Sequence, residues 1–103
     1  MFVIAVFYGN AAKAHFESGN SLLKHCSTDH LSSQGYCLGF IAGVADVMLT
    51  NPIYGFRACV PERVVLGQVV DVVVNNFKNS PEKRHFTAHS LVASYLSQAF
   101  PCK

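Results

Sequence analysis

Residues 32–52, SSQGYCLGFIAGVADVMLTNP, decide the fold class of this chain. Two serines that can cap a helix precede a long apolar run, and Thr50-Asn51-Pro52 ends it. We therefore expect one helix from Ser32-Ser33 to about Leu49. Its larger apolar side chains recur at helical spacing and predict one broad apolar face. The residues of this predicted face are Tyr36, Phe40, Ile41, Val44, Val47 and Met48.

Three glycines line one face of the same predicted helix. Gly35, Gly39 and Gly43 recur at intervals of four, and each costs about 1 kcal/mol relative to alanine in a helix interior. We expect a neighbouring helix or chain segment to approach closely along this glycine stripe. A second copy of the chain can also use the stripe for dimerisation.

Three further helices follow from the surrounding sequence. Ser18-Gly19-Asn20-Ser21 opens a short helix that ends near Cys26, and Thr87 can cap a last helix. Residues 60–77 are rich in valine, which favours strands, but their helical spacing favours a helix with Pro61 in its first turn. The last two helices are expected to bury Leu66, Val69, Val70, Val73, Phe77, Leu91, Val92, Tyr95, Leu96 and Ala99. The sequence therefore predicts an all-α fold, a compact single domain of four helices or slightly more.

The N-terminal segment has the pattern of a secretory signal peptide. Residues 2–8, FVIAVFY, are continuously apolar, and Ala12-Lys13-Ala14 has the small-x-small form that precedes cleavage. The usual cationic residues are missing before the apolar run, as in a truncated signal. We expect residues 1–14 to be removed and residues 15–103 to form the mature domain. The alternative is an uncleaved N-terminus that packs into the fold.

Composition excludes several classes of function. Half of the residues are hydrophobic and only 14% are charged, which is typical of a packed globule. Removal of Lys13 lowers the formal net charge from +2 to +1, and Lys83-Arg84 is the only adjacent basic pair, so we expect no nucleic-acid partner. No segment after the signal approaches the ~20 apolar residues of a membrane span. The mature protein is therefore not expected to be membrane-bound.

The chain contains four cysteines, and an even number in a small exported domain predicts two disulfides. Cys26 and Cys37 flank the short polar link between the first two helices, so their pairing is locally feasible. It leaves Cys59 to join Cys102. We favour this connectivity, although the other two pairings remain open on the sequence alone.

Two kinds of chemistry compete with this structural role of the cysteines. Cys37 lies near a helix N-terminus, where a thiol pKa falls, and His85 or His89 could act as its base in a thiol-dependent hydrolase. The pairs His85/His89 and Cys26/His30 also have the spacing of metal ligands on one helix face. Disulfide pairing leaves no thiol for either role, and neither a CxxC motif nor an acidic cluster is present. We predict no catalytic residue, no cofactor and no metal.

Seven motifs occur in a family-specific order after residue 14. They are Ser18–Leu23 (SGNSLL) followed by Cys26, Gly35–Asp46 (GYCLGFIAGVAD), Cys59–Glu62 (CVPE), Leu66–Gln68 (LGQ), Asp71–Val73 (DVV), Pro81–His85 (PEKRH), and Leu91-Val92 through Ala99–Cys102 (AFPC). Together they resemble the Rap1a/Tai immunity proteins over nearly the whole mature chain.

The resemblance implies a periplasmic, non-enzymatic, largely helical protein. Relatives of this kind bind peptidoglycan amidases that sister cells inject by type VI secretion, are often homodimeric, and occlude the active-site cleft of the toxin. A member of the family without a toxin target, bound to another envelope partner, is the alternative. The family commonly has glycine and threonine where this chain has Arg63 and Val65, so the usual hydroxyl N-cap of the third helix is lost.

Two loops are candidates for partner binding. The first, residues 50–58, combines aromatic bulk with a guanidinium, residue types that are enriched at interface hot spots. The second, residues 79–85, carries two basic side chains that can meet an acidic cleft rim. The candidate contact residues are Ile53, Tyr54, Phe56, Arg57, Lys83 and Arg84. The competing interpretation is that the side chains of the first loop cover the core of the domain or mediate dimerisation.

Overall fold

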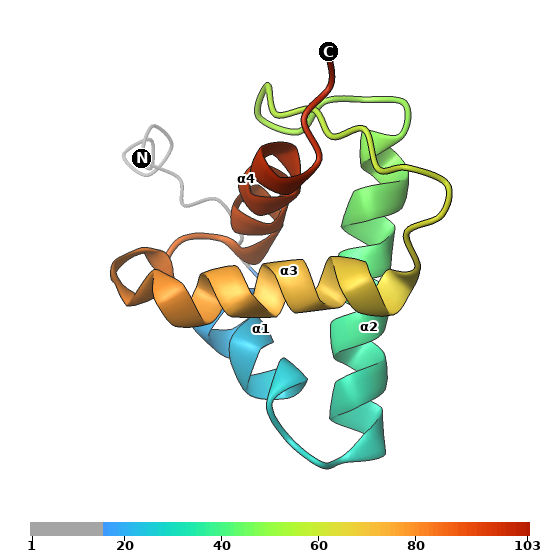
Figure 1. Ribbon diagram of the computed structural model, residues 1–103. Helices are drawn as coiled ribbons and strands as arrows, with labels where there is room; N and C mark the ends of the chain where they lie inside the picture. The colour runs from blue at the N-terminus through green and yellow to red at the C-terminus, as the bar shows by residue number, and fades with distance from the viewer. Residues whose placement is uncertain (1–15) are drawn as a thin grey trace, which may run out of the picture.

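The computed structural model describes residues 16–103 and confirms the all-α prediction (Figure 1). The predicted signal peptide, residues 1–14, lies outside the described residues. Four α-helices and one 3-10 turn make up the regular structure of the described part, which contains no strand. These elements are α1 (Gly19–Cys26), α2 (Leu31–Met48), α3 (Leu66–Asn79), η2 (Pro81–Lys83) and α4 (Ala88–Ala99).

Every pair of the four α-helices is in contact around one core. In Figure 1, α3 crosses α2 steeply, with α1 and α4 beside it. The largest fully buried side chains come from all four helices: Leu22, Ile41, Val73, Phe77, Val92 and Leu96. The Phe77 ring meets the Tyr95 ring edge-on, with 5.6 Å between the ring centroids. Most of the predicted core of α3 and α4 is buried, but Leu66 and Ala99, at the helix ends, are exposed.

Helix α2 buries only part of the face that the sequence predicted. Its buried side chains are Cys37, Ile41, Val44 and Met48. Tyr36 and Val47, which the sequence assigned to the apolar face, are 43% and 48% exposed. Ile41, Val44 and Met48 of the predicted face are buried, and Phe40 is partly buried against the core. The periodicity of an almost wholly apolar helix fits several rotations about its axis, and its tertiary contacts select one of them.

The expected close approach along the glycine stripe is also wrong within residues 16–103. A Cβ atom added at Gly35, Gly39 or Gly43 would meet nothing within 4 Å. The close approach occurs instead at Gly19 in α1, where a Cβ would lie 2.6 Å from Leu91 Cδ1 and 2.9 Å from the Arg84 carbonyl oxygen. The chain around Gly19 therefore needs a residue without a side chain.

Helix α3 begins later than predicted. Pro61 lies outside the helix in a turn, where the Val64 N–H donates to the Pro61 carbonyl at 3.0 Å. Val65 is the N-cap, and its backbone is extended, as β-branched residues favour. Its side chain has no hydroxyl, but the Gln68 Oε1 accepts a hydrogen bond from the Val65 N–H at 2.9 Å. Gln68 therefore makes one half of a capping box, while the other half, from a threonine hydroxyl to the Gln68 N–H, is absent; this N–H donates to the Val65 carbonyl at 2.9 Å.

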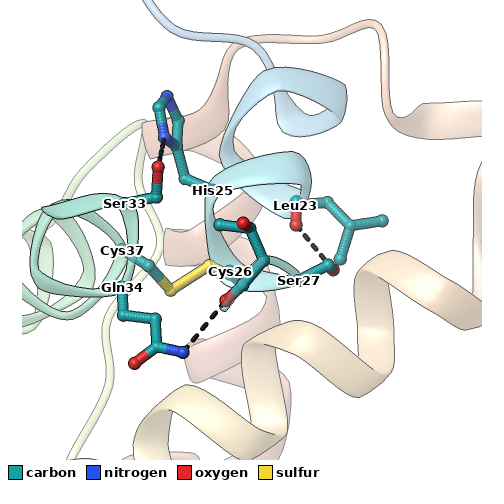
Figure 2. Close-up of a disulfide and its surroundings, with 8 residues drawn as sticks. Leu23, His25, Cys26, Ser27, Ser33, Gln34 and Cys37 are labelled. Carbon is teal, nitrogen blue, oxygen red and sulfur yellow. Dashed lines mark hydrogen bonds between the residues drawn. A yellow bond between two sulfur atoms is a disulfide. The ribbon is translucent and has the colours of Figure 1, made fainter. Parts of the chain in front are cut away.

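Both predicted disulfides are present. They join Cys26 to Cys37 and Cys59 to Cys102, which is the pairing that the sequence favours. Figure 2 shows the first bridge linking the end of α1 to α2, with His25 Nδ1 and Ser33 Oγ 3.3 Å apart beside it. The second bridge fastens the loop after α2 to the C-terminus, where the Cys59 N–H also donates to the Phe100 carbonyl at 2.8 Å.

A short antiparallel contact fixes the starts of α1 and α4 to each other. The Gly19 N–H donates to the Phe86 carbonyl, and the Ala88 N–H donates to the Glu17 carbonyl, both at 2.9 Å. Thr87 is the N-cap of α4, as predicted, although its hydroxyl bonds the Ser90 hydroxyl at 2.7 Å instead of a helix N–H. This contact places residues 16–18 next to the first turn of α4.

Candidate functional site

The predicted contact loop, residues 50–58, forms a tight turn at its tip. Ile53 and Phe56 face each other and exchange two backbone hydrogen bonds, at 3.0 and 2.8 Å. Tyr54 and Gly55 between them have positive φ angles, 51° and 79°. Such turns favour asparagine or glycine at both central positions. The left-handed backbone conformation of Tyr54 costs about 1–2 kcal/mol. The turn therefore places a bulky ring at its tip in spite of backbone strain.

The tip of this loop rests on the start of α4. The Tyr54 ring stacks on the His89 imidazole with 5.4 Å between centroids and 24° between planes. Tyr54 nevertheless remains 68% exposed, and Phe56 and Arg57 are exposed beside it. Ile53 is partly buried and packs against the core. The two interpretations of this loop each hold for part of it. Ile53 covers the core, and the other three candidate residues are exposed and free to contact a partner.

An apolar groove of about 500 Å³ begins at Ile53 and runs along the exposed side of α2. We call it the α2 groove. Tyr36, Gly39, Phe40, Gly43, Val44 and Val47 line it from α2, and Phe16, Glu17, Ile53, Thr87 and His89 complete it. The absence of side chains at Gly39 and Gly43 hollows the helix surface. The Tyr54 loop and this groove therefore form one continuous surface.

Glu17 is the only acidic residue that lines the α2 groove. Its Oε2 atom is buried and has no hydrogen-bond partner among residues 16–103. Desolvation and the nearby Glu17 carboxylate raise the pKa of the Tyr36 hydroxyl above its usual value. A buried carboxylate oxygen without a donor is unfavourable, so this position is suited to a donor from a partner.

The two basic residues of the second candidate loop differ in exposure. Lys83 is exposed on η2. Arg84 is partly buried: its carbonyl accepts from the Asn20 N–H at 2.7 Å, and its Nε atom is buried without a partner within the described chain. A second hollow, lined by Tyr54, His85 and Phe86 among others, lies between the two loops. The structure therefore brings the Tyr54 loop close to the segment that follows Lys83 and Arg84.

The structure contradicts the thiol hydrolase alternative. Cys37 is buried in the bridge to Cys26, and all four cysteines of the chain are disulfide-bonded. Within residues 16–103, no three histidine, cysteine or acidic side chains gather as metal ligands. His85 lies before α4 and packs near Phe86, so it does not share a helix face with His89. None of the helices in this part of the chain is long and apolar enough to cross a membrane.

Sequence reasoning missed the residues that make the α2 groove. It assigned Tyr36, Phe40 and Val47 to the apolar face. It considered His89 only as a base or a metal ligand and gave no role to Glu17. The glycine stripe was a usable signal, because small residues at intervals of four can also mark a face that a partner approaches. Nothing local in the sequence places Glu17 beside α2.

Comparison with known proteins gives one match. The family model described as Rap1a immunity proteins matches residues 18–102, which include all four helices and both disulfides. No curated protein and no solved structure gives a significant match.

Proposed function

This chain belongs to the Rap1a immunity protein family, and from that premise we propose that it protects its host by binding a peptidoglycan amidase delivered by type VI secretion. An immunity role implies a protein effector as the partner. The amidase as target, the periplasm as the place of action and occlusion of the active-site cleft are the specific parts of the proposal. The protein acts by binding and needs no cofactor.

The exposed Tyr54 ring carries this proposal. Tyr54 has a left-handed backbone conformation at the tip of a tight turn, and its ring stacks on the His89 imidazole. Strained residues of this kind are typical of functional sites. Aromatic rings and arginines are also common among residues that dominate binding energy, and Phe56 and Arg57 stand beside Tyr54. The turn can therefore enter a cleft with little loss of conformational entropy.

The two disulfides support action outside the cytoplasm. Such bonds persist in oxidising compartments and are rare where thiols are kept reduced. One bridge joins α1 to α2, and the other joins the segment before α3 to the C-terminus. They suit a small domain that works in the periplasm, where the peptidoglycan and an injected amidase meet.

The direct test is binding of the oxidised protein to the amidase candidate encoded beside its gene. Calorimetry gives the affinity and stoichiometry, and peptidoglycan hydrolysis is followed in parallel. We expect saturable binding that abolishes hydrolysis at the binding stoichiometry. A folded protein that does not bind an active amidase at micromolar concentrations would reject this pairing and favour an envelope partner other than a toxin.

A homodimer is a further part of the proposal. Leu31 and Leu38 of α2 are exposed outside the α2 groove and offer an apolar surface for it. Sedimentation velocity of the free protein between 1 and 100 µM, on the order of the range in which weak dimers dissociate, measures the oligomeric state. A single monomeric species across the range would contradict it.

A further inference from the structure

The α2 groove has the shape to receive an extended segment of a partner. Its floor is the exposed side of α2, where Gly39 and Gly43 present backbone without side chains. Tyr36, Phe40 and Val47 form apolar walls on the same helix. Because a Cβ at either glycine would meet nothing within 4 Å, no described part of the chain covers this floor.

The polar content of the groove indicates the chemistry of its occupant. The Glu17 carboxylate is its only acidic group, and the buried Oε2 atom has no donor among residues 16–103. Inside the fold, the Tyr36 hydroxyl interacts with the Glu17 carboxylate, and the backbone carbonyl of Glu17 accepts from the Ala88 N–H at 2.9 Å. The buried Oε2 atom is therefore the part of the side chain that is left for a partner. A carboxylate in apolar surroundings binds a cationic donor more strongly than a neutral one.

We propose that the α2 groove binds an apolar segment of the toxin that carries one lysine or arginine, and that this cation donates to Glu17. The inference rests on the proposed toxin-binding function and adds the chemistry of the recognised segment. Apolar side chains of the segment contact Phe40 and Val47, and its backbone approaches α2 over Gly43. Since Ile53 and His89 line one end of the groove, the same toxin also meets the Tyr54 loop.

Two substitutions test the groove, and the second has a matched control. Glu17→Gln keeps the shape and removes the charge, and we expect the Kd for the neighbouring amidase to rise at least tenfold, the loss of one charged hydrogen bond. Gly43→Leu fills the groove and should raise the Kd at least a hundredfold. Gly67→Leu adds the same side chain to α3, also into open space but outside the groove, and should leave the Kd unchanged. Circular dichroism confirms that each variant is folded.

A double-mutant cycle identifies the cation. Each surface lysine and arginine of the amidase is changed to alanine and combined with Glu17→Gln. One of them should couple to Glu17 by at least tenfold in Kd, so that its loss costs nothing further once the charge is gone.

The outcomes separate this inference from the proposed function. If the wild-type protein fails to bind the amidase, the proposed function falls and the groove inference falls with it. If the wild type binds but Glu17→Gln and Gly43→Leu bind equally well, only the groove inference is overturned. If Gly43→Leu instead dissociates a wild-type dimer in sedimentation and leaves the amidase Kd unchanged, the groove is a dimer interface and the inference is overturned as well.

Discussion

The Tyr54 ring lies stacked on the His89 imidazole, so a loop between α2 and α3 is fixed to the first turn of α4. The stack has two consequences. It orients the exposed ring before any partner arrives, which lowers the entropy that binding must overcome. It also joins the turn to the α2 groove, because His89 lines that groove.

Replacing Tyr54 with asparagine should separate binding from stability. Asparagine tolerates the positive φ of 51°, so relief of backbone strain offsets the lost ring stack, worth about 0.5–1.5 kcal/mol. We expect the free energy of unfolding to stay within about 1 kcal/mol of the wild type. The Kd for the amidase should rise at least tenfold, as for an interface hot spot. Urea unfolding and calorimetry measure the two quantities, and unchanged affinity would remove Tyr54 from the interface.

Arg57 offers a second test of the same loop. It is exposed, so Arg57→Ala should leave the unfolding transition in place while weakening toxin binding by roughly tenfold. Arg63→Ala is the control, because Arg63 is also exposed but lies beyond the Cys59 bridge and lines neither the α2 groove nor the hollow between the loops. Equal effects of the two substitutions would indicate general charge attraction instead of a specific contact.

Two glycines should respond in opposite directions to alanine. Gly19→Ala places a methyl group 2.9 Å from the Arg84 carbonyl oxygen, and such overpacking costs about 1–3 kcal/mol. Gly39→Ala meets open space and should stabilise α2 by about 1 kcal/mol through helix propensity. Thermal or urea unfolding of both variants checks the sign of each change. A destabilised Gly39→Ala protein would mean that this face is already covered.

The Cys59–Cys102 bridge should contribute a large part of the stability. It closes a loop with a sequence separation of 43, for which the chain-entropy estimate is about 4 kcal/mol. Cys59 is exposed and Cys102 only partly buried, so replacing both with alanine removes little packing. Non-reducing urea unfolding of the double variant measures the loss. A change below about 1 kcal/mol would contradict the entropic account.

The buried Tyr95 hydroxyl should make the free energy of unfolding depend on pH in the alkaline range. Burial raises the pKa of this hydroxyl, and the nearby Ser80 side chain lowers this pKa by a smaller amount. The buried hydroxyl oxygen has no hydrogen-bond partner among residues 16–103. Because the folded pKa lies above the unfolded value of about 10, its contribution is complete below pH 10. It is lost as the pH rises through the folded pKa. We expect Tyr95→Phe to unfold like the wild type at pH 7 and to lose less stability than the wild type at pH 11. Equal losses at pH 11 would contradict this.

Local signals in the sequence predicted much of the fold. Ser18 caps α1 and accepts from the Ser21 N–H at 3.1 Å, and Thr87 begins α4. The strongly amphipathic pattern of α3 identified Val69, Val73 and Phe77 as buried, although its start came five residues after Pro61. These features depend on residues within a few positions of one another, where caps and periodicity act.

The sequence by itself determined the four helices, the presence of two disulfides and the family, because caps, an even cysteine count and ordered motifs are properties of the chain; the structure then selected the favoured pairing of the cysteines. Only the tertiary structure decided which side of α2 is buried. It left Tyr36 and Val47 exposed, placed Glu17 in the α2 groove and stacked the Tyr54 ring on His89. An apolar helix can rotate about its own axis with little change in local energy. Its contacts with α1, α3 and α4, which lie far away in sequence, fix that rotation and therefore the surface that a partner meets.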